Sequence, residues 1–243
     1  MRIRTVKNPG LITAVEQTIS ASPQGEYHAK LFQALKDYDL YLYGGAIRDI
    51  LSGIINRKKN KITDFDWLVD DNAKPYHEQL LKSFPGMQKN RFGNLKWVPI
   101  EGVEMDLIPF SKTHIVMGKK GEEQKTGLTI DDILLASDFT PNSAAYDLRR
   151  KVIHNYQAIQ AINSRIFELN QHKDYDHVIL AKIILQSEKL GCEIGPRAQQ
   201  FIARKYSPEL NKQIREYLSY KKKVGRYNHV ISRLRNVQQE IKK

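Results

Sequence analysis

Short runs of aromatic and aliphatic residues in the first part of the chain predict β-strands. The run LYLY at 40–43 stops at two glycines, and DFDWLV at 64–69 combines acidic with apolar residues. Two further runs flank Glu101-Gly102, which favours a hairpin. The predicted strands are 40–43, 64–69, 95–100, 103–110 and 152–155.

Apolar residues at helical spacing predict helices, which dominate the chain after residue 155. Leu31, Phe32 and Leu35 show this spacing, and Gly53 is expected to close the second helix. Polar loops are expected at 55–62 and 119–127. The predicted helices are 27–39, 46–53, 75–84, 130–136, 156–168, 175–190, 196–205, 208–220 and 225–241. The pattern indicates an α+β protein, with a mixed-sheet domain at 1–155 and an all-α region at 156–243.

The acids in the 64–69 strand are candidate metal ligands. Asp64 and Asp66 are two positions apart, so both carboxylates project from the same side of the strand. Like charges at such a short distance repel one another unless a cation lies between them, and carboxylate oxygens are ligands that Mg²⁺ prefers. Two solvated surface acids are the alternative, but Phe65, Trp67 and Leu68 argue against an exposed strand.

A third acid is available in the 103–110 strand. Glu104 and Asp106 alternate with apolar residues, so both face one side. If this strand lies beside 64–69, one of them can complete the cluster, and we favour Asp106. Two metals held by three carboxylates can activate a hydroxyl and stabilise a departing pyrophosphate.

Gly44 and Gly45 join the first strand to a helix. Glycine allows a sharp turn and lets backbone amides approach an anion, and the N-terminus of the following helix favours phosphate. For a lone glycine pair, an ordinary strand-to-helix turn is the favoured explanation. The glycines indicate a triphosphate site only in combination with the acids that follow them in the chain.

The charge of the chain is strongly positive and unevenly distributed. The net charge is +12, and residues 201–243 carry 12 Lys or Arg against 3 Glu, a net of +9. This clustering favours a nucleic-acid partner. No apolar run is long enough for a membrane span, the N-terminus has no secretory signal, and Cys192 is alone, so we expect a cytoplasmic protein without a membrane partner.

The basic C-terminal helices are the candidate RNA surface. Basic residues interleaved with Tyr217, Tyr220 and Tyr227 suit single-stranded RNA, through phosphate contacts and base stacking. A solvated helix whose tyrosines pack inward is the alternative. The candidate RNA-binding residues are Lys221, Lys222, Lys223, Arg226, Arg233 and Arg235.

The ordered motifs resemble a known superfamily. YGGAIRDILSG followed by DFD is similar to the DNA polymerase β-type nucleotidyltransferases, in the branch of bacterial poly(A) polymerases and CCA-adding tRNA nucleotidyltransferases. IDDILLASDFTPNSAAYDL and MDLIPFS resemble two later motifs of that branch. The resemblance covers about residues 27–192 and makes 1–155 a catalytic head domain and 156–243 a neck and C-terminal region.

The resemblance implies roles for individual residues. Mg²⁺, as a two-metal site, is expected on Asp64, Asp66 and Asp106, which would be catalytic. The implied substrates are a nucleoside triphosphate such as ATP and an RNA 3′ end, with tRNA favoured. Asp49 would face the nucleotide or brace Arg48. The implied nucleotide-binding residues are Gly44, Gly45, Arg48, Asp49, Asp138 and Asn142.

Departures from the branch make this a short and divergent member. Ala136 and Ser137 replace two arginines, Ser111 replaces another, and Ile179 stands at the base-selecting arginine position. Either nucleotide choice differs or other residues hold the nucleotide, for which the candidates are Arg149, Arg150 and Lys182. Transfer to a protein or small molecule, and a catalytically silent RNA-binding protein, are the alternative functions.

Overall fold

The computed structural model describes most of the chain, in two compact units. The described residues are 2–22, 25–58, 60, 62, 64–72, 76–90, 93–101, 104–113, 127–171 and 175–242. One unit comprises residues 1–137 and 142–159, and the other comprises residues 138–141 and 160–243. The expected division into domains at residue 155 remains a proposal. The predictions at Pro75, Gly102 and 119–126 lie outside the described residues.

The first unit is built on an eight-stranded mixed sheet, so the predicted α+β class is confirmed. The strand order is β1-β8-β7-β2-β3-β6-β5-β4, with β3 and β6 parallel and the other described pairs antiparallel. The strands are β1 (Arg4–Val6), β2 (Leu40–Tyr43), β3 (Asp64–Val69), β4 (Met87–Lys89), β5 (Leu95–Trp97), β6 (Glu104–Pro109), β7 (Ala144–Asp147) and β8 (Val152–Asn155).

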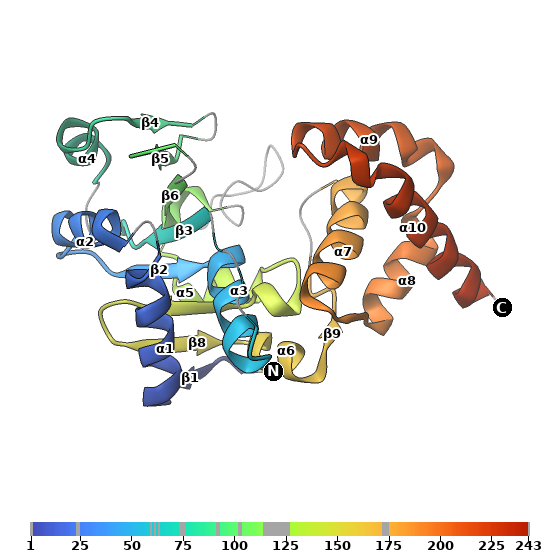
Figure 1. The fold of residues 1–243 in the computed structure, drawn as a ribbon, viewed down its shortest axis with the longest axis horizontal. Helices are drawn as coiled ribbons and strands as arrows, with labels where there is room; N and C mark the ends of the chain where they lie inside the picture. The colour runs from blue at the N-terminus through green and yellow to red at the C-terminus, as the bar shows by residue number, and fades with distance from the viewer. Residues whose placement is uncertain are drawn as a thin grey trace. The chain divides into compact units, whose positions relative to one another are not determined.

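Helices of the first unit pack against this sheet. The helix α3 packs against β2, β3, β7 and α1 (Figure 1). The helix α5 packs Ile133 and Leu134 into the apolar cluster that includes Tyr41 and Leu68 of the sheet. The helices of this part are α1 (Pro9–Ser20), α2 (Gly25–Ala34), α3 (Gly44–Ile55), α4 (His77–Ser83), α5 (Ile130–Leu135) and, at the boundary of the units, α6 (Ala158–Ser164).

The second unit is helical around its own apolar core. Ile183 and Ile184 of α7, Phe201 of α8, Leu218 of α9 and Leu234 of α10 all belong to this core. Its elements are β9 (Ile166–Phe167), α7 (Asp176–Leu190), β10 (Glu193–Ile194), α8 (Pro196–Lys205), α9 (Asn211–Tyr220) and α10 (Tyr227–Lys242) (Figure 1). The expectation that α7 is a core-packing helix is confirmed, because its Ile179 is fully buried there.

Some local predictions were wrong. Gly53 does not close α3, which continues to Ile55; a Cβ at Gly53 would lie 2.9 Å from the carbonyl oxygen of Lys58, so the glycine accommodates the returning chain. The region after residue 155 is not entirely helical, because β9 and β10 form a parallel pair. The short elements β1, β4 and β7 and the helix α1 were not predicted.

Candidate active site

Three carboxylates meet where β3 and β6 lie side by side. In this parallel pair Asp66 is in register with Asp106, and Asp64 is in register with Glu104. One carboxylate oxygen from each of Asp64, Asp66 and Asp106 lies within 4.8 Å of the others. Asp64 is exposed, whereas Asp66 and Asp106 are half-buried. The cluster is therefore open to solvent on one side and supported by the sheet on the other.

This donor set fits a divalent metal. Three carboxylates so close together repel one another, and a hard cation would offset that repulsion with the oxygen ligands that Mg²⁺ prefers. β3 lies between β2 and β6, so the acids do not belong to an exposed edge strand. Of the two candidates for the third acid, the structure brings Asp106 into the cluster, while Glu104 is bonded to Lys96.

The glycine turn lies against one of these acids. Gly44 has φ +68°, and a Cβ there would lie 3.2 Å from Oδ2 of Asp66. Tyr43, the residue before the helix, makes no side-chain cap to the first amides of α3. The start of α3 thus lies beside the carboxylate cluster, where its dipole and its first backbone amides favour an anion.

Arg48 and Asp49 form a buried pair in the first turns of α3. The Arg48 Nε donates to Oδ1 of Asp49 at 2.8 Å, and its Nη1 donates to Oδ1 of Asn142 at 3.0 Å. Arg48 and Asp49 are each 5% exposed. Of the two roles expected for Asp49, the geometry favours bracing Arg48. Asn142 in turn ties the loop before β7 to α3.

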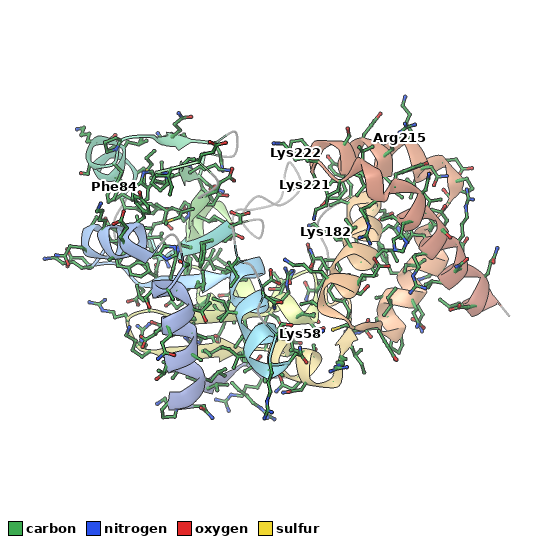
Figure 2. The ribbon with its side chains drawn as sticks, in the orientation of Figure 1. Lys58, Phe84, Lys182, Arg215, Lys221 and Lys222 are labelled. Atoms are coloured by element: carbon green, nitrogen blue, oxygen red, sulfur yellow. The ribbon has the colours of Figure 1, made fainter. Side chains whose placement is uncertain are left out.

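Asp138 belongs to the helical unit, apart from the unit that carries the other expected nucleotide-binding residues. Its carboxylate pairs with the Lys182 ammonium at 3.2 Å, and its carbonyl oxygen accepts from the amide of Asn170. Lys182 is labelled on α7 in Figure 2. The two residues thus form an ion pair within that unit, between its first segment and α7.

Two serines that stand where the related branch carries arginine, Ser137 and Ser111, make hydrogen bonds to nearby side chains. The hydroxyl of the buried Ser137 lies 3.0 Å from that of Tyr43, the last residue of β2. The amide and hydroxyl of Ser111 both donate to the carboxylate of Asp71, at 3.0 and 2.5 Å.

Arg149 and Arg150 lie at the wrong end of the sheet to replace those arginines. Both pair with Asp39, at 3.1 and 2.9 Å, and Asp39 precedes β2 whereas the glycine turn follows it. Arg150 also pairs with the fully buried Asp147 at 2.8 Å. These contacts stabilise the fold far from the carboxylate cluster.

The arginines of the candidate RNA surface differ in what they contact. Glu188 of α7 accepts Arg226 at 2.6 Å and His229 at 2.6 Å, and lies 3.7 Å from Arg233. Arg226, the residue before α10, and Arg233 of α10 therefore help to hold α10 against α7. Arg235 instead lines a shallow hollow on α10 itself.

Lys221, Lys222 and Lys223 follow the end of α9 and are exposed. The side chains of the first two are labelled in Figure 2. The Lys221 ammonium lies 5.4 Å from the ring centre of Tyr220, which is 61% exposed. Tyr217 and Tyr227 instead pack partly buried against the helical core. These three lysines and Tyr220 are exposed residues of the candidate RNA surface, as are Arg226, Arg233 and Arg235.

Lys96 of β5 was not singled out from the sequence. It is in register with Asp106 across β5 and β6, and its ammonium bonds to the carboxylate of Glu104. The bonded Glu104 raises the pKa of Lys96, and the nearby charges of Asp106 and Asp64 add to that effect. Its position between the apolar Leu95 and Trp97 of a predicted strand was a signal that it projects from the face opposite to theirs.

In the part of the chain that the structure describes, we find no helix with the length and apolar character needed to cross a membrane.

Comparisons with known proteins agree with this geometry. The sequence profile of the poly(A) polymerase head domain matches residues 40–168, more than half of the chain. That match includes the glycine turn and all three clustered acids. Among curated proteins, no sequence matches the chain.

Solved structures with the same fold include enzymes of tRNA processing. A CCA-adding enzyme in its apo form I has a TM-score of 0.64 at 19% identity, over 98% of this chain and 55% of that one. The Thermotoga maritima CCA-adding enzyme complexed with tRNA has a TM-score of 0.58 at 20% identity, over 90% and 51%. A tRNA nucleotidyltransferase complexed with a primer tRNA and an incoming ATP analogue has a TM-score of 0.58 at 15% identity, over 86% and 60%.

The chain spans about half the length of these solved structures. At such identities the likeness shows a shared fold.

Proposed function

The chain belongs to the poly(A) polymerase head-domain family, and we propose that it is a metal-dependent nucleotidyltransferase that extends an RNA 3′ end, with tRNA as the favoured acceptor. The observation that carries the proposal is the cluster of Asp64, Asp66 and Asp106 beside the Gly44 turn. A carboxylate cluster alone could bind any hard cation. Next to an anion-favouring helix start, it suits a metal-bound triphosphate.

In the proposed reaction the RNA 3′ oxygen attacks the α-phosphorus of a nucleoside triphosphate. A new P–O bond forms, the bond to the bridging oxygen breaks, pyrophosphate leaves, and the hydroxyl proton is released to solvent. Asp64, Asp66 and Asp106 would hold Mg²⁺, which supplies charge stabilisation for the transferring phosphoryl group. The first amides of α3 would face the phosphates, and Arg48 would keep that helix start in place.

The RNA would bind through the exposed basic residues of the helical unit. Lys221, Lys222 and Lys223 can contact phosphates, and the exposed ring of Tyr220 can stack on an unpaired base. Solved relatives of the same fold were captured with a primer tRNA and with nucleotides, which supports both partners of the proposal.

A different acceptor is the second candidate. Ser111 and Ser137 stand where the related branch carries arginine, and both make hydrogen bonds to nearby side chains. Arg149 and Arg150 form ion pairs with Asp39. These contacts support a change in how the nucleotide or the acceptor is recognised. A protein or small-molecule acceptor is consistent with this difference.

The test is transfer of label from each α-labelled nucleoside triphosphate, with Mg²⁺, to total RNA. The Asp64→Asn/Asp66→Asn variant is expected to lose all transfer, because the metal loses two ligands. The matched control is Glu78→Gln/Glu101→Gln, which removes two exposed acids outside the cluster and should stay active. Label on protein or a small molecule would favour the second candidate. Transfer that survives in the aspartate variant would refute the metal centre.

A further inference from the structure

A row of charged side chains crosses three strands of the sheet at the carboxylate cluster. Asp66 of β3 is in register with Asp106 of β6, and Asp106 is in register with Lys96 of β5. Residues in register on neighbouring strands project from the same face of a sheet. Lys96 is therefore the next side chain in this row after Asp106.

Glu104 lies next to this row and could serve as a fourth carboxylate. It is in register with Asp64 and two positions before Asp106, so it shares the face of both. Its carboxylate oxygen nevertheless bonds to the Lys96 ammonium. The side chains of Lys96 and Glu104 are 33% and 47% exposed, so neither is held in place by burial. The ion pair is the contact that fixes the direction of Glu104.

From this geometry we propose that Lys96 is a positioning residue, which holds Glu104 out of the carboxylate cluster and so limits the metal centre to three acidic ligands. The proposal rests on the proposed function in taking the cluster as a metal site. Without Lys96, Glu104 would be free to turn toward the metal. An additional carboxylate would bind the metal more tightly and would take a coordination position that phosphate oxygens would otherwise fill.

The consequences for binding and for catalysis then have opposite signs. Removal of the Lys96 ammonium should tighten metal binding in the absence of nucleotide. It should also raise the KM for the nucleoside triphosphate, because Glu104 competes with its phosphate oxygens. If Lys96 merely supported the fold, its removal would weaken both metal binding and nucleotide binding.

The experiment is a double-mutant cycle on Mn²⁺ affinity, measured by titration of the whole chain without nucleotide. Lys96→Met is expected to bind Mn²⁺ roughly tenfold more tightly than the wild type. In the Glu104→Gln background the same substitution should change affinity by no more than about threefold, the part that one charge near a divalent ion contributes by itself. Lys96→Arg keeps the ion pair and should behave like the wild type.

Controls separate this proposal from the proposed function. Lys89→Met removes an exposed lysine of β4 in the same sheet and should leave Mn²⁺ affinity unchanged. Asp64→Asn/Asp66→Asn should abolish Mn²⁺ binding, which locates the metal at the cluster whether or not RNA is extended. An equal effect of Lys96→Met in both backgrounds, or no effect, overturns the role of Lys96 alone. Mn²⁺ binding that survives in the aspartate variant overturns the metal centre as well.

Discussion

Asp66 and Asp106 lie side by side on parallel neighbouring strands, although 40 positions separate them in the chain. β3 and β6 bring them into register, and Asp64 joins them from two positions earlier. The cluster therefore depends on one parallel strand pair within a largely antiparallel sheet. Four predictions concern the glycine turn beside this cluster, two buried residues of the same unit, and the exposed lysines of the helical unit.

Gly44→Ala is expected to impair both stability and metal binding. The positive φ of +68° would cost an L-residue about 1 kcal/mol, and the new Cβ, 3.2 Å from Asp66 Oδ2, would displace a ligand. Displacement of that kind lowers metal affinity or activity by about 10- to 100-fold. Gly191→Ala is the matched control, since Gly191 has φ +66° with open space around it. It should lose similar stability in urea denaturation and keep its metal affinity.

Arg48→Met is expected to destabilise the fold strongly. Asp49, 5% exposed, would lose the charge that faces it, and breaking a buried pair on one side costs about 3–5 kcal/mol. Asp49→Asn in the Arg48→Met background should recover part of that loss, because no buried charge remains. The loss in Arg48→Met and its partial recovery in the double variant are measured as free energies of unfolding in urea. If Arg48→Met is as stable as the wild type and only raises the nucleotide KM, then Arg48 acts on phosphate instead.

His28 is expected to make the fold sensitive to mild acid. Burial lowers the pKa of His28 to about 4, and its ring packs edge-on against Phe65 with 4.5 Å between ring centres. Because the folded pKa is depressed, the unfolded chain takes up the proton first, and stability falls as the pH drops from about 6.5 to about 4. One such group contributes about 3 kcal/mol over this range.

His28→Leu should remove that contribution. Thermal or urea unfolding of the variant at pH 7 and at pH 4 should show a smaller difference than the wild type, by the same amount. An equal loss of stability in the two proteins would show that other groups cause the acid sensitivity.

The lysines after α9 are expected to carry RNA affinity. Lys221→Gln/Lys222→Gln/Lys223→Gln should weaken single-stranded RNA binding by about tenfold, and should reduce the slope of log affinity against log salt by up to about 2. Fluorescence anisotropy across a salt series measures both. An unchanged slope would mean that these lysines do not contact phosphate.

The control for this surface removes equal charge elsewhere on the helical unit. Lys189, Arg204 and Lys212 are exposed, and neutralising them together should have a smaller effect. Arg226→Gln/Arg233→Gln should behave differently again, because it leaves Glu188 with only His229 among these partners. We expect that variant to lower the stability of the helical unit.

The local parts of the site could be predicted from the amino-acid sequence alone. Alternation along a strand placed Asp64 and Asp66 on one face, and the glycines marked the turn into α3, because both features depend on near neighbours in the chain. The same local rules missed β9 and β10, whose few residues pair only through contacts with each other. The family profile and the mixed sheet then agreed with what the ordered motifs had indicated.

Which side chains meet depends on contacts between segments that lie far apart in the chain. Alternation along the strand placed Glu104 and Asp106 on the same face and did not distinguish them. The register of β3, β6 and β5 places Asp106 in the cluster, while Glu104 forms an ion pair with Lys96. Likewise, Arg226 counted as one more positive charge until Glu188, from another helix, was found to bind it. Strand order, register and helix packing depend on contacts between distant segments, and periodicity along one segment contains no information about its neighbours in space.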